Sequence, residues 1–185
     1  MMKTKKLLII ALILIIVIPV LIYASFISST MSSNIITFGN LRMELIETSI
    51  DENGNEIRVK NNENENISLN SSVSRRVRIK NICNHPMFVR IKLSLLLDNE
   101  YDNNLNNSVW YDINNEDFLY QDGWYYYLKP LEPGKETDNL ITQMNFNLIG
   151  LDNYMGKTIK LNIDAQAVQS ENQTDNVMSA KGWPE

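Results

Sequence analysis

The stretch Val89-Arg90-Ile91-Lys92-Leu93-Ser94-Leu95 alternates apolar and polar side chains from end to end. Successive side chains of a β-strand point to opposite faces, so this pattern predicts a strand with one apolar and one polar face. Segments 41–45, 77–80, 144–148 and 159–167 repeat the pattern. Sheets that are wet on one face are antiparallel, and two of them bury their apolar faces against each other. The sequence therefore predicts an all-β protein, an antiparallel two-sheet sandwich.

The segments between these strands carry turn signals. Asn53-Gly54 supplies the positive φ angles of a tight hairpin, and the stretch from Pro130 to Gly134 holds two prolines and a glycine. Segments 61–70 and 98–107 are rich in Asn and acidic residues, which predicts solvated loops. These connections agree with a protein made of short antiparallel strands.

The amino-terminal residues predict export. Lys3, Lys5 and Lys6 precede an uncharged run over residues 7–26, and positive residues before an apolar segment hold the amino end on the cytoplasmic side. The run can be a cleaved signal peptide or a retained anchor. Pro19 shortly before the small residue Ala24 favours cleavage after Ala24. We therefore expect the leader to provide the protein's one contact with a membrane.

Charge narrows the class of partner. The chain has 17 basic and 22 acidic residues, a net charge of −5. Loss of the three lysines in the leader leaves 14 basic residues against 22 acidic ones, or −8. Nucleic-acid binding needs a basic face, so we expect no nucleic-acid partner. The same charge argues against docking on anionic lipid.

The reactive residues are few. Cys83 is the single cysteine, so it cannot form an internal disulfide; it could link two chains, but a small buried side chain near a strand end is the favoured interpretation. His85 is the single histidine, which excludes a two-histidine zinc motif, and its place before Pro86 is typical of a turn. The oxygen-rich segment 51–56 lacks the acidic spacing of an EF-hand. We predict no catalytic residue, no metal ligand and no cofactor.

The run Trp124-Tyr125-Tyr126-Tyr127 is the most unusual local feature. On a strand, one pair of these rings would fill the core while the other pair would lie on the surface or against a neighbouring chain. We assign Tyr125 and Tyr127 as the surface pair. Exposed rings could also form a carbohydrate-binding platform.

Several short segments follow one another in an order that matches a known family. They are Ala24-Ser25-Phe26 with Thr37-Phe38-Gly39-Asn40-Leu41, Arg78-Ile79-Lys80-Asn81 with Phe88-Val89-Arg90-Ile91-Lys92-Leu93, Asp122-Gly123-Trp124-Tyr125-Tyr126-Tyr127, Leu131-Glu132-Pro133-Gly134-Lys135-Glu136-Thr137, and Ile163-Asp164-Ala165-Gln166-Ala167-Val168-Gln169 with Trp183. In these segments the chain resembles the TasA/camelysin family of secreted biofilm-matrix and surface proteins of Gram-positive bacteria. It departs from the family pattern at Ile82-Cys83 and at the ending Gly182-Trp183-Pro184-Glu185.

The resemblance implies a jelly-roll-like sandwich and a structural role without enzymatic activity. It implies processing by a SipW-type signal peptidase, secretion to the extracellular matrix or cell surface, and a homo-polymer, with another matrix protein as a further candidate partner. It also implies donor-strand exchange, in which the amino-terminal segment of one subunit adds a strand to the next. Apolar residues for such a strand are Phe26, Ile27, Ile35 and Ile36.

We therefore expect a signal peptide at 1–24, a flexible arm and candidate donor strand at 25–37, a sandwich at 38–169 and a polar tail at 170–185, loosely held from Ser170 to Ala180. The leading hypothesis is a self-associating structural subunit. The alternative is a monomeric adhesion or ligand-binding module that uses exposed aromatic rings. Camelysin has been described as a metalloprotease, but this sequence shows no recognisable metal site, so peptidase activity is not expected.

Overall fold

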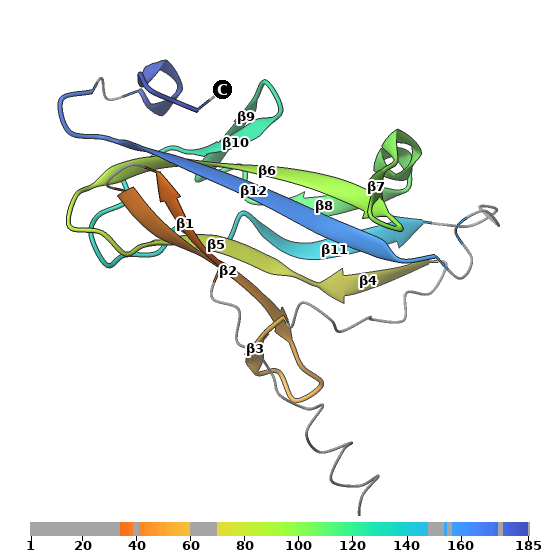
Figure 1. Cartoon of the computed structure of the whole chain (residues 1–185). Helices are drawn as coiled ribbons and strands as arrows, with labels where there is room; N and C mark the ends of the chain where they lie inside the picture. The colour runs from red at the N-terminus through yellow and green to blue at the C-terminus, as the bar shows by residue number, and fades with distance from the viewer. Residues whose placement is uncertain are drawn as a thin grey trace, which may run out of the picture. The chain divides into compact units, whose positions relative to one another are not determined.

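The computed structural model describes residues 34–38, as backbone alone, and residues 41–59, 70–147, 154, 157–173 and 176–184. Nearly all of the regular structure is β (Figure 1). The strands are β1 (Asn34–Phe38), β2 (Leu41–Ile50), β3 (Glu56–Arg58), β4 (Asn70–Ser74), β5 (Arg76–Asn81), β6 (Met87–Leu97), β7 (Glu100–Tyr101), β8 (Val109–Ile113), β9 (Phe118–Gln121), β10 (Trp124–Tyr127), β11 (Ile141–Asn147) and β12 (Ile159–Gln169). Two short 3₁₀ helices, η1 (Asn103–Asn107) and η3 (Val177–Ser179), complete the described elements.

One layer of the fold joins two hydrogen-bonded sheets. In the first, β2 pairs with β1, β3 and β5; in the second, β11 lies between β4 and β8. The segment before β11 continues the pairing of β5, because Thr137 N donates to Ile79 O and Leu140 N donates to Val77 O, each at 2.8 Å. The two sheets therefore form one continuous antiparallel layer.

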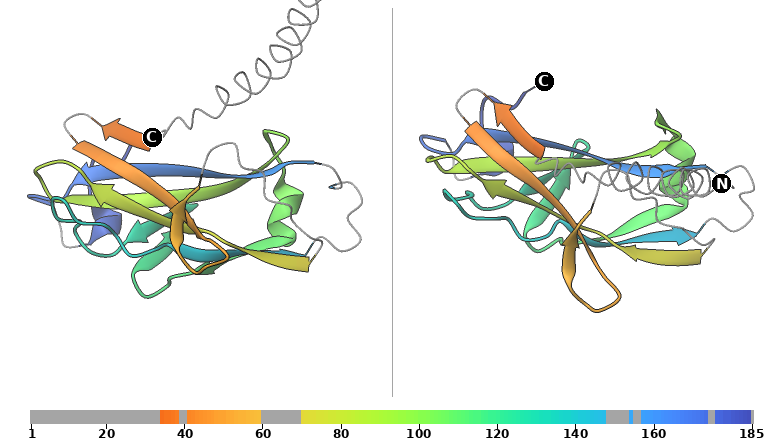
Figure 2. Two further views of the ribbon diagram at one scale, coloured as in Figure 1. Left: turned by 90° about the horizontal axis from the view of Figure 1, so that it is seen from below. Right: turned by 60° about the horizontal axis from the view of Figure 1, so that its bottom comes forward.

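The other layer is the sheet ordered β12-β6-β10-β9, with β7 paired to the far end of β6. β12 runs antiparallel to β6 along its whole length, from Ile159 opposite Leu97 to Gln169 opposite Met87. Figure 2 shows this layer facing the β2–β5 layer from two further directions. The predicted all-β antiparallel sandwich is confirmed, and each of the five alternating segments lies in a strand as far as the described residues reach, which for segment 144–148 is residue 147.

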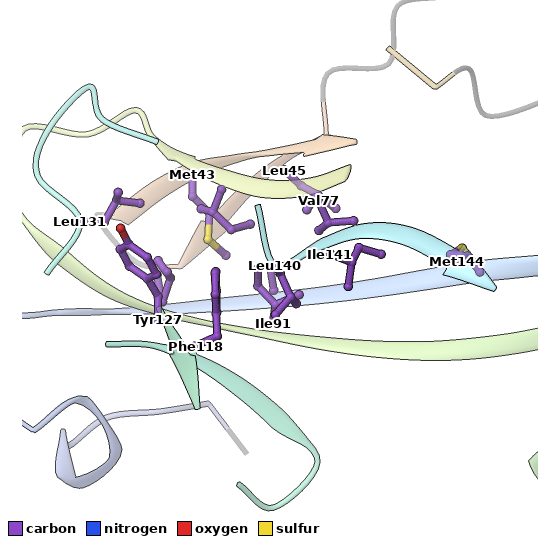
Figure 3. Close-up of a cluster of buried hydrophobic side chains, with 14 of the residues drawn as sticks. Met43, Leu45, Val77, Ile91, Phe118, Tyr127, Leu131, Leu140, Ile141 and Met144 are labelled. Carbon is purple, nitrogen blue, oxygen red and sulfur yellow. The ribbon is translucent and has the colours of Figure 1, made fainter. Parts of the chain in front are cut away.

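The core fills the space between the layers, and its members come from both (Figure 3). On β6 the side chains of Met87, Val89 and Ile91 are fully buried, as the alternation predicted. Because close-packed interiors leave few voids, each of these side chains depends on its neighbours in the opposite layer. Other core members are Met43, Leu45, Val77, Ile79, Phe118, Tyr127, Leu131, Leu140, Ile141, Met144 and Phe146.

The connections follow the turn signals in part. Gly54 has φ +83° in the β2–β3 hairpin and Gly134 has φ +74° in the turn before Thr137, both in the left-handed region that glycine adopts without strain. Segment 98–107 differs from the predicted solvated loop, since it contains β7 and η1, and Leu105 of η1 is fully buried. The predicted loop at 61–70 lies outside the described residues up to position 69. Among the described residues, no helix is long and apolar enough to cross a membrane.

The carboxyl-terminal segment differs from its prediction. We expected a loosely held polar tail, but Val177 and Ala180 are buried against Phe88, Tyr126 and Val168. Figure 1 shows η3 close to the carboxyl-terminal end of β12. The prediction was wrong because the few apolar residues of this tail are spaced to meet one patch of the outer face, which its overall polarity conceals.

Candidate functional site

The predicted donor segment reaches the described structure at β1. Asn34–Phe38 pairs antiparallel with β2, and the register places Ile35 opposite Glu44 and Ile36 opposite Met43. Among the described strands, β1 pairs with β2 alone, so it is an edge strand. Phe26, Ile27 and the predicted cleavage residue Ala24 lie outside the described residues.

β2 holds β1 along one side only. On its other side, Met43 to Thr48 pairs with β5, so this half of β2 is anchored in the sheet independently of β1. Phe38 pairs with Leu41, which leaves two residues between the strands. If β1 separated from β2, the backbone N–H and C=O groups of β2 that now bond to β1 would be free. They could then pair with another extended segment.

The aromatic strand β10 places its rings differently from our assignment. Tyr127 is 6% exposed and packs in the main core beside Phe118, at a ring-centroid distance of 5.1 Å. Its hydroxyl donates to Asp138 at 3.1 Å. Tyr127 is therefore not a surface residue, because a ring facing the opposite layer is covered by it.

Tyr125 is half-buried on the same face. It packs at 4.8 Å from the ring of Tyr120, which is exposed on β9. Burial raises the pKa of Tyr125 above its ordinary value, as it does for Tyr111 on β8. These tyrosines line the border of the core between the β8 and β9 edges, and Tyr125 contributes packing there.

The outward pair of β10 forms the most elaborate cluster of the described chain, around Arg90 of β6. The Arg90 guanidinium lies 4.4 Å from the ring centroid of Trp124 and 4.7 Å from that of Trp183. A cation between two indole rings is stabilised by both ring quadrupoles. We call Arg90 and the side chains around it the Arg90 cluster.

Hydrogen bonds complete the Arg90 cluster. Arg90 Nε and Nη2 donate to Gln166 Oε1 at 2.8 and 2.5 Å, Nη1 donates to Tyr126 Oη at 2.9 Å, and Nη2 also donates to Pro184 O at 3.0 Å. Gln166 and Tyr126 are the direct cross-strand neighbours of Arg90. The guanidinium therefore binds the carboxyl-terminal segment to the outer face of the sheet. Sequence reasoning missed this role because the partners are far apart along the chain.

A second polar cluster lies where β5 ends. Asn81 is fully buried; its Nδ2 donates to His85 O and to Leu131 O, each at 2.8 Å, and its Oδ1 accepts from Cys83 N at 2.9 Å. These bonds join the β5–β6 connection to the segment after β10 and satisfy the whole side-chain amide. Cys83 is buried beside it, which confirms the predicted small buried side chain near a strand end.

The candidates for chemistry lie at the surface. His85 is exposed, and its Nδ1 is 3.7 Å from a carboxylate oxygen of Glu171, which is exposed as well. In the described part of the chain, no three His, Cys, Asp or Glu side chains are grouped so that they could hold a metal ion.

The oxygen-rich turn after β2 is closed by its own hydrogen bonds. Asp51 accepts from the backbone N–H of Asn55 at 2.7 Å and from that of Asn53 at 2.9 Å. The Asn55 bond is the main reason why the pKa of Asp51 lies below its ordinary value. The carboxylate thus serves the hairpin turn.

Comparisons with protein-family models, with curated proteins and with solved structures found no match to this chain.

Proposed function

We propose that this protein is an exported, non-enzymatic structural subunit of an extracellular matrix or surface fibre, which self-associates through its amino-terminal segment. The observation that carries the proposal is β1, an edge strand that contains the last residues of the predicted arm and is held in the sheet by pairing with β2. In the polymer, a segment of one subunit within 25–38 would pair with β2 of the next subunit in place of that subunit's own β1.

The energetics of this exchange are favourable for assembly. The donated strand forms with the neighbouring subunit the backbone hydrogen bonds that β1 forms with β2 of its own subunit. The free energy lost when β1 leaves β2 is therefore nearly balanced by the free energy gained when the donated strand pairs with β2. Additional contacts from Phe26 and Ile27, which lie ahead of β1 in the sequence, would then favour the polymer. Because the exchange is head to tail, it generates an open filament when the rotation between neighbouring subunits does not close a ring.

The surface of the described domain is consistent with a structural role. The outer faces of β2 and β5 carry an ion-pair network in which Arg78 contacts Glu56 at 2.5 Å and Glu136 at 2.8 Å. Such networks keep a large β surface soluble and limit unintended strand pairing. His85 and Glu171 form a surface contact that needs no catalytic explanation.

The test uses the chain from Ser25, folded from denaturant and followed by size-exclusion chromatography with light scattering over time and concentration. We expect growth into a regular high-mass polymer. Removal of residues 25–33, which keeps β1, should slow or abolish growth while circular dichroism still reports a folded sheet. A synthetic peptide of residues 25–38 should terminate growth when added in excess, whereas a scrambled peptide of the same composition should not.

A stable monomer at every concentration would reject the fibre proposal. The adhesion alternative would then take first place, and Trp110 and Tyr120, which are both more than half exposed, would be its ring candidates. Assembly that is insensitive to the peptide of residues 25–38 would show a polymer built through a different surface.

A further inference from the structure

The side of the sandwich away from β12 ends in two open strand edges. Among the described strands, β8 pairs only with β11, and β9 pairs only with β10. β7 lies on this side too, because it pairs with the edge of β6 that β12 does not occupy. We call the described residues 98–129 the β8–β9 flank.

The β8–β9 flank carries most of the exposed large hydrophobic side chains of the described chain. Trp110 is 51% exposed on β8, and Tyr120 is 59% exposed on β9. Only Ile57, on β3, lies elsewhere. The others on the flank are Tyr101, Leu119 and Leu128. Scattered single residues of this kind need no explanation, but their concentration beside open edges marks an interaction surface.

The β8–β9 flank is also strongly acidic. Its single cation, Lys129, is paired with Asp117 at 2.5 Å. In the described structure, no ion pair reaches the other six carboxylates. Nearby cations therefore do not neutralise the negative potential of this surface, and such a potential attracts a cationic partner. The carboxylates of the flank are Asp98, Glu100, Asp102, Asp112, Glu116, Asp117 and Asp122.

The amino-terminal donor segment does not match this surface, because residues 25–38 contain no lysine or arginine. The alternating basic strands of a second copy do not match it either. β5 is bonded by β2 and by the segment before β11, and β6 is paired by β12 and β10, so neither can leave its layer. The complementary partner is therefore a different polypeptide.

β8 shows what that polypeptide would contain. Trp110 and Asp112 are exposed and share one face, while Tyr111 and Ile113 share the other, where they are half-buried at the border of the core. We propose that the open edge of β8 binds an extended cationic segment of another protein as an added strand. Its lysine or arginine residues lie beside Trp110 and Asp112, and the alternate apolar residues cover Tyr111 and Ile113.

The experiment measures binding of a fluorescein-labelled peptide, Lys-Val-Lys-Val-Lys-Val-Lys, by fluorescence anisotropy. The protein is expressed with its leader, and the form that the cell produces, with the leader cleaved or retained, is purified. One comparison peptide replaces each lysine with glutamate, and another keeps the composition but groups the lysines and valines in two blocks. We expect the alternating cationic peptide to bind about tenfold more tightly than either comparison peptide.

Variants locate the site. Trp110→Ser should weaken binding about tenfold and Asp112→Asn about threefold, since a central aromatic anchor outweighs a solvated charge at an interface. The matched controls are Ile57→Ser, an exposed apolar residue on β3, and Glu52→Gln, an exposed carboxylate in the β2–β3 turn. Neither control should change the affinity. Thermal unfolding of each variant verifies that the sandwich is intact.

Equal affinity for the alternating and block peptides would show charge attraction without strand addition, and would overturn the proposal. Absence of binding, or equal weakening by the β3 and turn controls, would overturn it as well. Polymer growth measured by light scattering reports separately on amino-terminal assembly. Because the donor segment has no charged side chain, that growth should persist in Trp110→Ser and at high salt, so the two proposals can fail independently.

Discussion

Replacement of Arg90 by alanine tests whether the carboxyl-terminal segment is an integral part of the fold. The substitution removes a cation from between Trp124 and Trp183, and it removes hydrogen bonds to Gln166 and to the carbonyl of Pro184. The packing of Val177 and Ala180 would remain as the main contact of this segment with the sheet.

The expected cost follows from these contacts. Two cation–π contacts at half-buried positions contribute about 1 kcal/mol each. The charged hydrogen bonds contribute about 1.5 kcal/mol more in total, because water replaces part of what is lost at a half-exposed site. We therefore expect Arg90→Ala to lower the free energy of unfolding by about 3.5 kcal/mol. Arg90→Lys should cost about half of that, since an ammonium keeps the charge but cannot form the planar fork.

Urea denaturation followed by tryptophan fluorescence measures the effect, because two of the three tryptophans flank Arg90. Lys92→Ala is the matched control: Lys92 lies on the same face of β6 and reaches the Trp124 ring only at 5.9 Å, so it should cost less than about 0.5 kcal/mol. Equal stability of the Arg90→Ala and Lys92→Ala proteins would refute this account of the Arg90 cluster.

Three further substitutions test other parts of the structure. Asn81→Ala leaves the buried N–H of Cys83 without its acceptor and removes one of the two donors to the Leu131 carbonyl, so it should cost about 3 kcal/mol in urea denaturation; a loss below about 1 kcal/mol would contradict the role given to Asn81. Phe118→Ala should cost about 3–5 kcal/mol in the same assay, because the ring is 1% exposed in the main core, and preserved stability would place Phe118 outside that core. Glu56→Gln tests pH dependence: the Thr48 hydroxyl first, and then Arg78, lower the Glu56 pKa from 4.5, so its contribution is present above that pH and is lost as the pH falls through the lowered value. The difference in free energy of unfolding between wild type and Glu56→Gln, below about 1 kcal/mol for this partly exposed pair, should therefore shrink as the pH falls from 6 to 2. A difference that grows instead would contradict a stabilising role for the ionised Glu56 carboxylate.

The strands that could be predicted from the sequence are those with one face in the core and the other in contact with solvent. On β6, Val89, Ile91 and Leu95 are buried in the core while Arg90 and Lys92 lie on the outer face, so apolar and polar residues alternate in the sequence there. β8 and β9 were not predicted, because Trp110 and Leu119 are exposed at the border of the sandwich and break the alternation there. The surface role given to Tyr125 and Tyr127 failed for a related reason: alternation separates the two pairs but does not say which pair faces inward.

By itself, the sequence determined the all-β class, the main strands and the turns at Gly54 and Gly134, since these depend on side-chain alternation and on backbone angles that neighbouring residues set. Only the tertiary structure decided where the faces meet. The Arg90 cluster joins β6, β10, β12 and the end of the chain, and the Asn81 amide joins β5 to the carbonyl of Leu131. Such contacts depend on how the layers bring distant segments together, and no local spacing in the sequence encodes them.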